Sequence, residues 1–195
     1  LRSRDKRTAL QYLAANHLPV PDSVFTAMPD NVDSSLRILG EEYPIVIKML
    51  NSTQGQGVIL GESHSASLSV AEAFIRLKEE ILLQRFIGES KGKDVRVFIV
   101  GGQVVAAMER SAQNGEFRSN LHRGASSHKI RITSEEEEIA LRAAQLMGLE
   151  VAGVDILRSN TGPLILEVNA SPGLEGIEGT TGVDIASQII RFVET

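Results

Sequence analysis

Residues 151–169 read Val-Ala-Gly-Val-Asp-Ile-Leu-Arg-Ser-Asn-Thr-Gly-Pro-Leu-Ile-Leu-Glu-Val-Asn, two apolar runs joined by a turn-rich segment. The pattern predicts a β-hairpin centred near Thr161. Such a hairpin would place Asp155 directly opposite Glu167. Asn169 would share the face of Glu167, because alternate strand residues point the same way. Two carboxylates that face each other in a sheet repel and destabilise it. The hairpin therefore indicates a cation between them.

The donor atoms indicate which cation this site would hold. All of the ligands would be oxygens, which suits magnesium or manganese and not zinc or copper. An alternative hypothesis has the Asp155 carboxylate paired with an arginine in the core. The residues of the hairpin leave both possibilities open.

Composition limits the class of protein. The chain has 195 residues, of which 42% are hydrophobic and 23% are charged, which is enough for one domain that could hold two lobes. Its net charge of −5 argues against direct nucleic-acid binding, which needs a basic face. The chain has no cysteine, which excludes disulfides, a thiolate nucleophile and cysteine-ligated zinc.

The sequence carries no membrane or export signal that we can identify. No apolar run approaches the roughly 20 residues of a membrane span, and no apolar signal-peptide region follows the basic N-terminus. We therefore expect a cytoplasmic protein without a membrane partner. The sequence begins at Leu1 and not at Met, which predicts a fragment or a processed product.

Hydrophobic periodicity and turn residues predict an α+β protein with mainly antiparallel strand pairing. A loop is predicted over residues 113–128, and a glycine-rich loop is predicted after the hairpin. The predicted helices cover residues 3–15, 34–42, 65–80, 134–147 and 183–194. The predicted strands before the hairpin cover residues 44–48, 58–60, 81–87, 95–100 and 103–109.

Four consecutive acids, Glu135 to Glu138, open the predicted helix that begins at Ser134. Glu137 would complete a capping box with Ser134. Acids in a first helical turn interact favourably with the helix macrodipole. This interpretation explains the four acids better than metal binding does.

Lys48 ends an apolar strand just before the loop Asn51-Ser-Thr-Gln-Gly-Gln-Gly57. Glycines let backbone N–H groups approach phosphate closely, and a nearby ammonium group offsets phosphate charge. The loop is neither a Walker A motif nor a dinucleotide fingerprint. A lid over a nucleotide and a plain flexible hairpin are both compatible with it.

Two further segments could contact a nucleotide or a substrate. Residues 84–87, Gln-Arg-Phe-Ile, leave a strand and could offer backbone groups to an adenine edge, although an ordinary strand end would look the same. Residues 117–124 contain Arg118, Asn120 and Arg123, and arginine forks recognise phosphate or carboxylate groups. The alternative is a solvated basic loop.

Taken together, these motifs resemble the ATP-grasp superfamily, and within it the RimK-type α-L-glutamate ligases. The resemblance covers essentially the whole chain. The narrower match rests on residues 4–6 (Arg-Asp-Lys), 117–124 (Phe-Arg-Ser-Asn-Leu-His-Arg-Gly), 151–157 (Val-Ala-Gly-Val-Asp-Ile-Leu) and 167–178 (Glu-Val-Asn-Ala-Ser-Pro-Gly-Leu-Glu-Gly-Ile-Glu).

The resemblance implies an ATP-grasp fold with two lobes, each with an antiparallel sheet and helices, and the nucleotide between them. The small lid lobe would span about residues 20–83. The larger lobe would comprise about residues 84–195 and a helix over 1–16. Full members of the family also carry an N-terminal domain, which the resemblance predicts to be absent from this sequence.

The resemblance also assigns site residues. Lys6 and Lys48 would approach phosphates, and Asp94 occupies the ribose position. Asp155, Glu167 and Asn169 match the ligands of two magnesium or manganese ions, with Glu167 bridging them. The full set of predicted nucleotide contacts is Lys6, Lys48, Gln54, Gly55, Gly57, Gln84, Arg85, Phe86, Asp94, Arg118, Ser119 and Asn120.

Two residues depart from the family pattern. Relatives usually have an acid where Arg85 stands, which leaves the role of that side chain in doubt. Ala125 stands where a second glycine is common, and we expect that change to have a small effect.

The implied activity is ATP-dependent ligation of a carboxylate to an amine through an acylphosphate. Arg110, Arg123 and Lys48 are the candidate catalytic residues, with the two arginines holding substrate carboxylates or stabilising an oxyanion. The expected partners are glutamate and the C-terminus of a small-subunit ribosomal protein, and a homo-oligomer is possible. The alternatives are a small-cofactor, amino-acid or peptide acceptor, a phosphotransferase, and a nucleotide-binding module without turnover.

Overall fold

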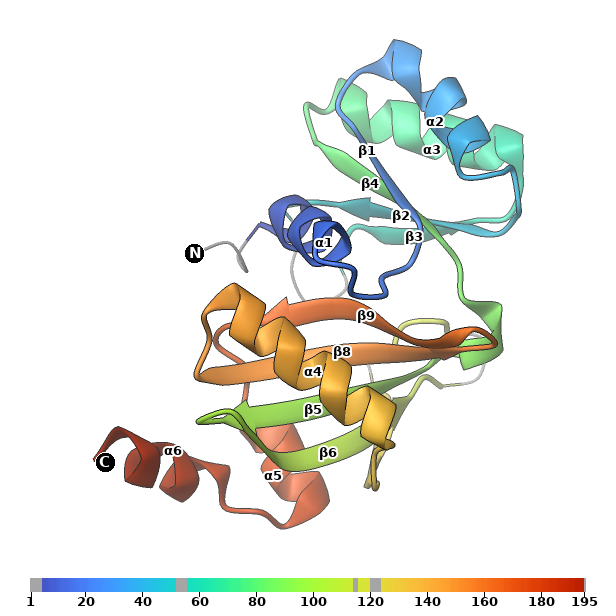
Figure 1. Cartoon of the computed structure of the whole chain (residues 1–195). Helices are drawn as coiled ribbons and strands as arrows, with labels where there is room; N and C mark the ends of the chain where they lie inside the picture. The colour runs from blue at the N-terminus through green and yellow to red at the C-terminus, as the bar shows by residue number, and fades with distance from the viewer. Residues whose placement is uncertain (1–4, 52–55, 114–115, 120–123, 195) are drawn as a thin grey trace. The chain divides into compact units, whose positions relative to one another are not determined.

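The computed structural model describes residues 5–51, 56–113, 116–119 and 124–194. The chain forms two compact units, which Figure 1 shows. The larger unit comprises Leu1–Val20 and Gly88–Thr195, and the smaller unit comprises Pro21–Ile87. Within the described ranges, no helix has the length and apolar character needed to cross a bilayer.

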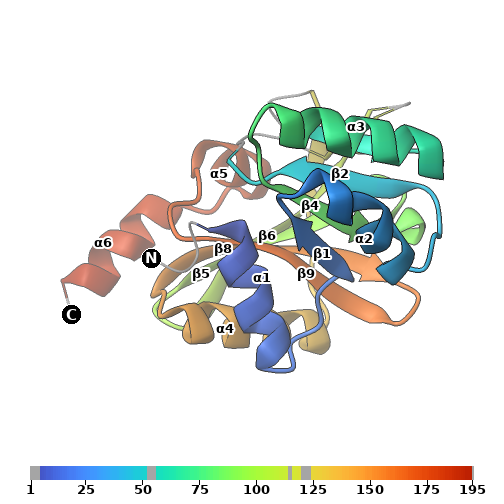
Figure 2. The ribbon, with the colours of Figure 1, turned by 90° about the horizontal axis from the view of Figure 1, so that it is seen from above.

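The smaller unit is a four-stranded antiparallel sheet with helices on one face. Its strands, in the order β1-β4-β2-β3, are Ser23–Thr26, Ile81–Arg85, Ile45–Met49 and Val58–Gly61. The 3-10 helix η2 (Pro29–Asn31) leads into α2 (Val32–Ile38), which packs beside α3 (His64–Arg76). Figures 1 and 2 show α2 and α3 side by side over the sheet.

Alternation along the strands decides which side chains face these helices. Ile45 and Ile47 of β2 belong to the apolar core beneath α2 and α3, together with Ile81 and Leu83 of β4. The residues between them, including Lys48, consequently point to the other face of the sheet. That face carries Lys48 and Gln84 together with the apolar Val46 and Leu82.

The larger unit is a five-stranded antiparallel sheet with helices on both faces. Its strands, in the order β7-β6-β5-β8-β9, are Ser126–Lys129, Gln103–Ser111, Lys93–Val100, Val151–Ser159 and Gly162–Asn169. The 3-10 helix η3 (Gly88–Ser90) precedes β5. The helices of this unit are α1 (Lys6–Ala15), α4 (Ser134–Met147), α5 (Glu175–Thr181) and α6 (Ile185–Val193).

Strand β5 shows how the two faces differ. Val95, Val97 and Ile99 pack in the core with α1 and α4, whereas Phe98 packs with residues of α5 and α6. Asp94 and Arg96 alternate with the valines and therefore point to the same face as Phe98. That face of the sheet carries the candidate site.

The predicted hairpin is confirmed, with β8 and β9 joined through Asn160 and Thr161 and with Asp155 paired to Glu167. The structure adds a β-bulge, because Ile156 pairs with Ile165 and leaves Leu166 without a partner in the register. A bulge reverses the alternation of side chains at one point of a strand. It allows Ile165 to join the core beneath the helices while Glu167 points to the opposite face.

Two short strands and one short α-helix were not predicted. Strand β7 begins in the predicted loop 113–128 and ends one residue beyond it. Helix α5 lies within the predicted glycine-rich loop, and β1 precedes the first predicted strand. The sequence of β7, Ser-Ser-His-Lys, has no apolar alternation and depends on its pairing with β6. Helix α5 contains two glycines and buries Ile177 against the sheet. Tertiary contacts therefore determine the secondary structure of β7 and α5.

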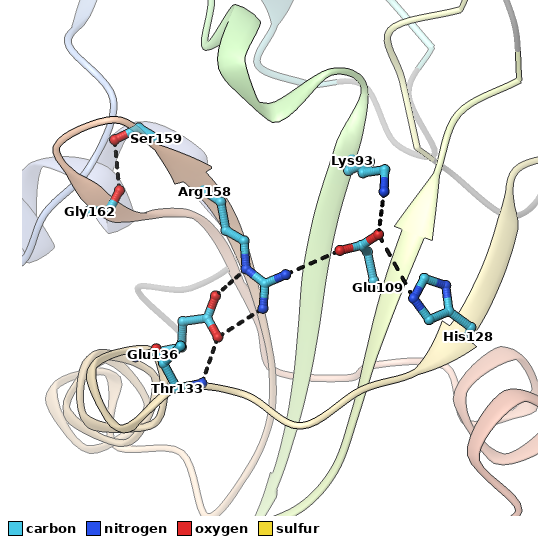
Figure 3. A network of polar contacts seen from close by, with 8 residues as sticks. All are labelled: Lys93, Glu109, His128, Thr133, Glu136, Arg158, Ser159 and Gly162. Atoms are coloured by element: carbon cyan, nitrogen blue, oxygen red, sulfur yellow. Dashed lines mark hydrogen bonds and ion pairs between the residues drawn. The ribbon is translucent and has the colours of Figure 1, made fainter.

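The capping box of α4 lies one residue earlier than predicted. Thr133, not Ser134, is the N-cap, and it exchanges hydrogen bonds with Glu136, not Glu137. Figure 3 shows that the Glu136 carboxylate also binds Arg158 of β8, at 2.6 Å from Nε and 3.1 Å from Nη2. The macrodipole interpretation therefore misses this second role of Glu136, which ties the start of α4 to the sheet.

The contacts of Arg158 extend across the α4 face of the sheet. Its Nη1 lies 3.1 Å from Glu109 of β6, and Glu109 also accepts a hydrogen bond of 2.8 Å from Lys93 of β5. The side chain of Glu136 is only 3% exposed. The side chain of Arg158 is 44% exposed and also contacts Glu109, so the cost of removing the Glu136 charge comes mainly from the lost charge-assisted hydrogen bonds.

We expect Glu136→Gln to lower the free energy of unfolding by about 1–2 kcal/mol. The matched control is Glu137→Gln, an exposed acid in the same helical turn, which should change stability by less than about 0.5 kcal/mol. Urea denaturation of the two variants measures the difference. Equal effects would contradict the role given to the Arg158 pair.

Candidate functional site

The site face of the larger unit gathers charged residues from adjacent strands. Asp94 of β5 pairs with Arg110 of β6, and Arg96 of β5 pairs with Asp155 of β8. Asp155 pairs in turn with Glu167 of β9. Because directly opposed residues of neighbouring strands lie close together, the strand register alone assembles the cluster.

Both carboxylate oxygens of Asp155 accept hydrogen bonds from Arg96. Nε of Arg96 lies 2.7 Å from Oδ1, and Nη2 lies 2.6 Å from Oδ2. Nη2 of Arg110 reaches the same Oδ2 at 3.1 Å. The Asp155 side chain is 5% exposed, so two guanidinium groups neutralise it away from water.

Arg110 also holds Asp94, through two hydrogen bonds of 2.6 Å. The hydroxyl of Ser119 donates a further bond of 2.6 Å to Oδ2 of Asp94. Arg110 therefore joins two buried carboxylates, and the two arginines balance the charges of the two aspartates. Glu167, partly exposed on the neighbouring strand, adds a further acid beside Asp155.

These contacts shift the pKa values of the cluster. Burial would raise the pKa of Asp155, but the charges and hydrogen bonds of Arg110 and Arg96 outweigh it and lower the pKa to about 2. Burial raises the pKa of Asp94, with Arg110 opposing the rise and the charge of Asp155 adding to it. The Asp155 carboxylate is consequently ionised at neutral pH and can act as a ligand.

The three predicted metal ligands fit magnesium in their chemistry. Asp155, Glu167 and Asn169 place two carboxylates and an amide on one face of two neighbouring strands, and hard divalent cations prefer oxygen donors. Yet both oxygens of Asp155 accept from arginine, and no cluster of three metal-binding histidines or acids occurs in the described part of the chain. The alternative of an arginine-paired Asp155 therefore describes this structure.

The loop after Asn169 lies against the hairpin at Gly153. A Cβ atom at this position would stand 2.8 Å from Cβ of Pro172. Such a distance is too short for two carbon atoms in contact, so this approach of Pro172 requires glycine. Because Gly153 pairs with Asn169, the contact fixes where the chain goes directly after the predicted ligands.

In the smaller unit, Lys48 takes part in a chain of hydrogen bonds. Its Nζ donates to Oε1 of Gln84 at 2.7 Å, and Nε2 of Gln84 donates to the Ser23 hydroxyl at 2.9 Å. That hydroxyl donates to the Pro21 carbonyl at 2.8 Å. Gln84 is only 2% exposed. A buried neutral amide thus orients the ammonium group without cancelling its charge.

The side chain of Arg85 lies among acids of the same unit. Its Nη2 is 2.6 Å from Glu42, and its Nη1 is 3.8 Å from Asp22. Its backbone N–H donates to the Asp22 carbonyl. The side chain of Arg85 is thus satisfied locally, while Phe86 beside it is partly buried.

Arg118 is bound to an acid of its own loop. Its Nε and Nη2 donate to Glu116 at 3.0 and 2.7 Å, and its guanidinium lies 5.4 Å from the centre of the Phe117 ring. The hydrogen bond from Arg118 is the main reason why the pKa of Glu116 is lowered to about 2. Glu116 therefore holds the arginine that the sequence assigned to nucleotide.

Of the remaining residues predicted to contact nucleotide or substrate, the structure describes some and not others. Lys6 is the first residue of α1, directly after the N-cap Asp5. Gly57 has a positive φ of 62°, and a Cβ atom there would meet Sδ of Met49 at 2.6 Å, so the β2–β3 connection requires glycine. Gln54, Gly55, Asn120 and Arg123 lie outside the described residues.

Arg96 is the site residue that sequence reasoning missed. A signal for it exists, because Asp94 and Arg96 are polar residues on one face of a strand that is apolar from Val97 to Val100. Strand alternation places both beside Phe98, on the face that also carries Asp155. A polar pair at this spacing could have been assigned to the site.

Comparisons of the sequence with a family model and with curated proteins agree on one family. The model of the RimK-like ATP-grasp domain matches residues 3–193. A "Probable alpha-L-glutamate ligase" of Nitrosococcus oceani is 56% identical over 193 residues, which cover 99% of this chain and 64% of that protein. A protein of the same name from Hydrogenovibrio crunogenus is 54% identical with the same coverage. The chain thus spans about two thirds of the length of these relatives.

Solved structures agree with this result. The ATP-grasp ligase PsnB, complexed with precursor peptide PsnA2 and AMPPNP, is similar with a TM-score of 0.75 and 25% identity over 98% of this chain and 59% of PsnB. The D-alanine–D-alanine ligase of Bacillus anthracis, complexed with ATP, has the same fold, with a TM-score of 0.78 at 18% identity over 100% of this chain and 66% of that one. By sequence and by fold, this chain belongs to the RimK-like ATP-grasp family.

Proposed function

We propose that this chain is the nucleotide- and metal-binding part of an ATP-dependent carboxylate–amine ligase that uses glutamate as the amine. The observation that carries the proposal is the oxygen-donor set of Asp155, Glu167 and Asn169 on one face of the β8–β9 hairpin. Membership of a family whose relatives are named glutamate ligases supports the choice of glutamate.

The chemistry requires activation of a carboxylate, because an amine does not attack a carboxylate anion at a useful rate. In the proposed reaction an oxygen of the acceptor carboxylate attacks the γ-phosphorus of ATP, and ADP leaves. The amine of glutamate then attacks the acyl carbon of the acylphosphate and loses a proton. The carbon–oxygen bond to phosphate breaks, so the products are an amide, ADP and phosphate.

The proposed roles of the residues follow their positions. Asp155, Glu167 and Asn169 would hold two magnesium or manganese ions, which when bound neutralise phosphate charge during transfer. Lys48, oriented by Gln84, and Lys6 would approach the phosphates. The contacts of Arg110 with Asp94 and Asp155 favour ordering of these acids over the predicted contact with a substrate carboxylate. Arg123 stays the candidate for that contact.

For the acceptor, we propose a peptide C-terminus, with that of a small-subunit ribosomal protein as the first choice. PsnB, an ATP-grasp ligase complexed with a precursor peptide, supports a peptide over a small cofactor. A ribosomal acceptor implies a cytoplasmic enzyme. A phosphotransferase is the second candidate, but it would need a general base near an acceptor hydroxyl, and the site gives no specific support for one.

The decisive test uses the full-length protein with ATP, magnesium, glutamate and candidate acceptor peptides. We expect phosphate release that requires both glutamate and acceptor, with mass spectrometry detecting glutamate added to the peptide. We further expect Glu167→Gln to lower turnover by about two orders of magnitude or more with the circular dichroism spectrum unchanged. Glu138→Gln, an exposed acid of α4, is the control.

Two results would refute the proposal. A phosphorylated alcohol as the product would identify a phosphotransferase. Full activity of Glu167→Gln would remove the hairpin from the site.

Gln84 offers a test of the nucleotide end. Gln84→Glu places a negative charge beside Lys48 and should weaken ATP binding by about tenfold, because the ammonium group is then neutralised before phosphate arrives. Gln103→Glu, the same change at an exposed position of β6, should leave affinity unchanged. Titration with a fluorescent ATP analogue measures both variants, and equal affinities would exclude this role for Gln84.

The low pKa of Asp155 predicts a pH-dependent contribution to stability. Its folded pKa of about 2 lies below the usual value near 4, so the contribution is fully present above pH 4 and is lost as the pH falls toward 2. Asp155→Asn should therefore destabilise the protein more at pH 7 than at pH 2.5, by about 2 kcal/mol. Chemical denaturation at both pH values measures this change, and a gap that does not depend on pH would contradict it. Asp30→Asn, at an exposed position, is the control and should change stability little at pH 7.

A further inference from the structure

The bonds of Asp155 leave little room for a metal ion. Oδ2 accepts from Nη2 of Arg96 at 2.6 Å and from Arg110 at 3.1 Å, which uses both of its lone pairs. Oδ1 accepts from Nε of Arg96 at 2.7 Å. A divalent ion that binds either oxygen would stand within a few ångströms of a fixed guanidinium, and two cations so close repel each other.

Of the two arginines, Arg96 is the one that can leave. Arg110 is held by two bonds to Asp94, which Ser119 also binds, and its side chain is 6% exposed. The side chain of Arg96 is 18% exposed, and in the described part of the chain Asp155 is its one hydrogen-bond partner. Moving Arg96 therefore breaks two hydrogen bonds to one carboxylate, whereas moving Arg110 breaks its bonds to both Asp94 and Asp155.

We propose that Arg96 is a positioning residue that occupies the Asp155 carboxylate in place of the metal and makes metal loading depend on the nucleotide. The inference rests on the proposed role of Asp155 as a metal ligand. Without nucleotide, a metal ion must displace Arg96 and leave its guanidinium without a counter-charge. With nucleotide, the phosphates supply negative charge both for the metal and for the displaced arginine.

Charge balance supports this order of binding. The two arginines already balance Asp94 and Asp155, and Glu167 is the additional acid nearby. A divalent ion added without phosphates would give this cluster a net positive charge in a largely buried place, which is unfavourable. Metal and nucleotide should consequently bind with strong positive coupling.

The test measures Mn²⁺ binding to the full-length protein without nucleotide, by the electron paramagnetic resonance signal of free Mn²⁺. Arg96→Met should raise the Mn²⁺ affinity by about tenfold or more, since Asp155 then lacks its main counter-charge. The matched control is Arg158→Met. Arg158 lies on the same strand as Asp155 but bonds to Glu136 and Glu109 on the other face, so its loss should leave Mn²⁺ affinity unchanged.

Two further variants make the result specific. Arg96→Lys keeps the charge but loses the fork that binds both oxygens, so it should raise the affinity by a smaller factor. If Arg96→Met does not fold, Arg96→Lys is the variant that tests the proposal. In Arg96→Met combined with Asp155→Asn, the gain should disappear, because the gain depends on the freed carboxylate.

The proposal is overturned if the Arg96 variants bind Mn²⁺ as the wild type does, or if Arg158→Met raises the affinity equally. Failure of the proposed function looks different. Tighter Mn²⁺ binding by Arg96→Met, with no glutamate-dependent phosphate release from the wild type, would sustain the role of Arg96 and refute the ligase. Normal ligase activity of the wild type, with unchanged Mn²⁺ binding in the Arg96 variants, would support the ligase and refute the role of Arg96.

Discussion

Asp155 is an ionised carboxylate with almost no access to water, and much of the larger unit is arranged around the need to neutralise it. A buried charge is tolerated only where an opposite charge and hydrogen bonds replace the lost water. Arg96 and Arg110 provide both, from strands β5 and β6. The order of strands brings both arginines within reach of β8, because β5 lies beside β8 and β6 lies one strand further away.

The sheet meets this requirement by keeping its two faces chemically separate. On the α4 face, Val95, Val97 and Ile99 fill a core with α1 and α4. On the other face, Asp94 and Arg96 occupy the positions between them. The bulge at Leu166 maintains the separation in β9, because it lets Ile165 face the core and Glu167 face the site. Strict alternation would have put both residues on one side.

The sequence predicted those parts of the site that depend on strand register. Facing positions for Asp155 and Glu167 follow from the turn residues and from apolar alternation, and the structure has that register. The bulge could not be predicted, because it depends on how β9 fits the core beneath α1 and α4. Likewise, the local sequences of β7 and α5 favour a strand and a helix only weakly. The pairing of β7 with β6 and the packing of α5 against the sheet determine their structure. Arg96 was predictable in principle from its alternation with Val95 and Val97.

The hairpin led to two hypotheses. One places a metal cation between the carboxylates, and the other pairs Asp155 with an arginine. The two hypotheses are compatible. Both answer the same electrostatic demand, since a carboxylate in this position needs a positive charge whatever its source. With arginine in place, the carboxylate stays ionised, and in the proposed scheme it remains available as a ligand. A guanidinium on a flexible stem can withdraw when phosphates offer a better partner, whereas an ammonium or an apolar residue could not bind both oxygens. Under the proposed role of Asp155 as a metal ligand, the arginine-paired state is the resting form of the site.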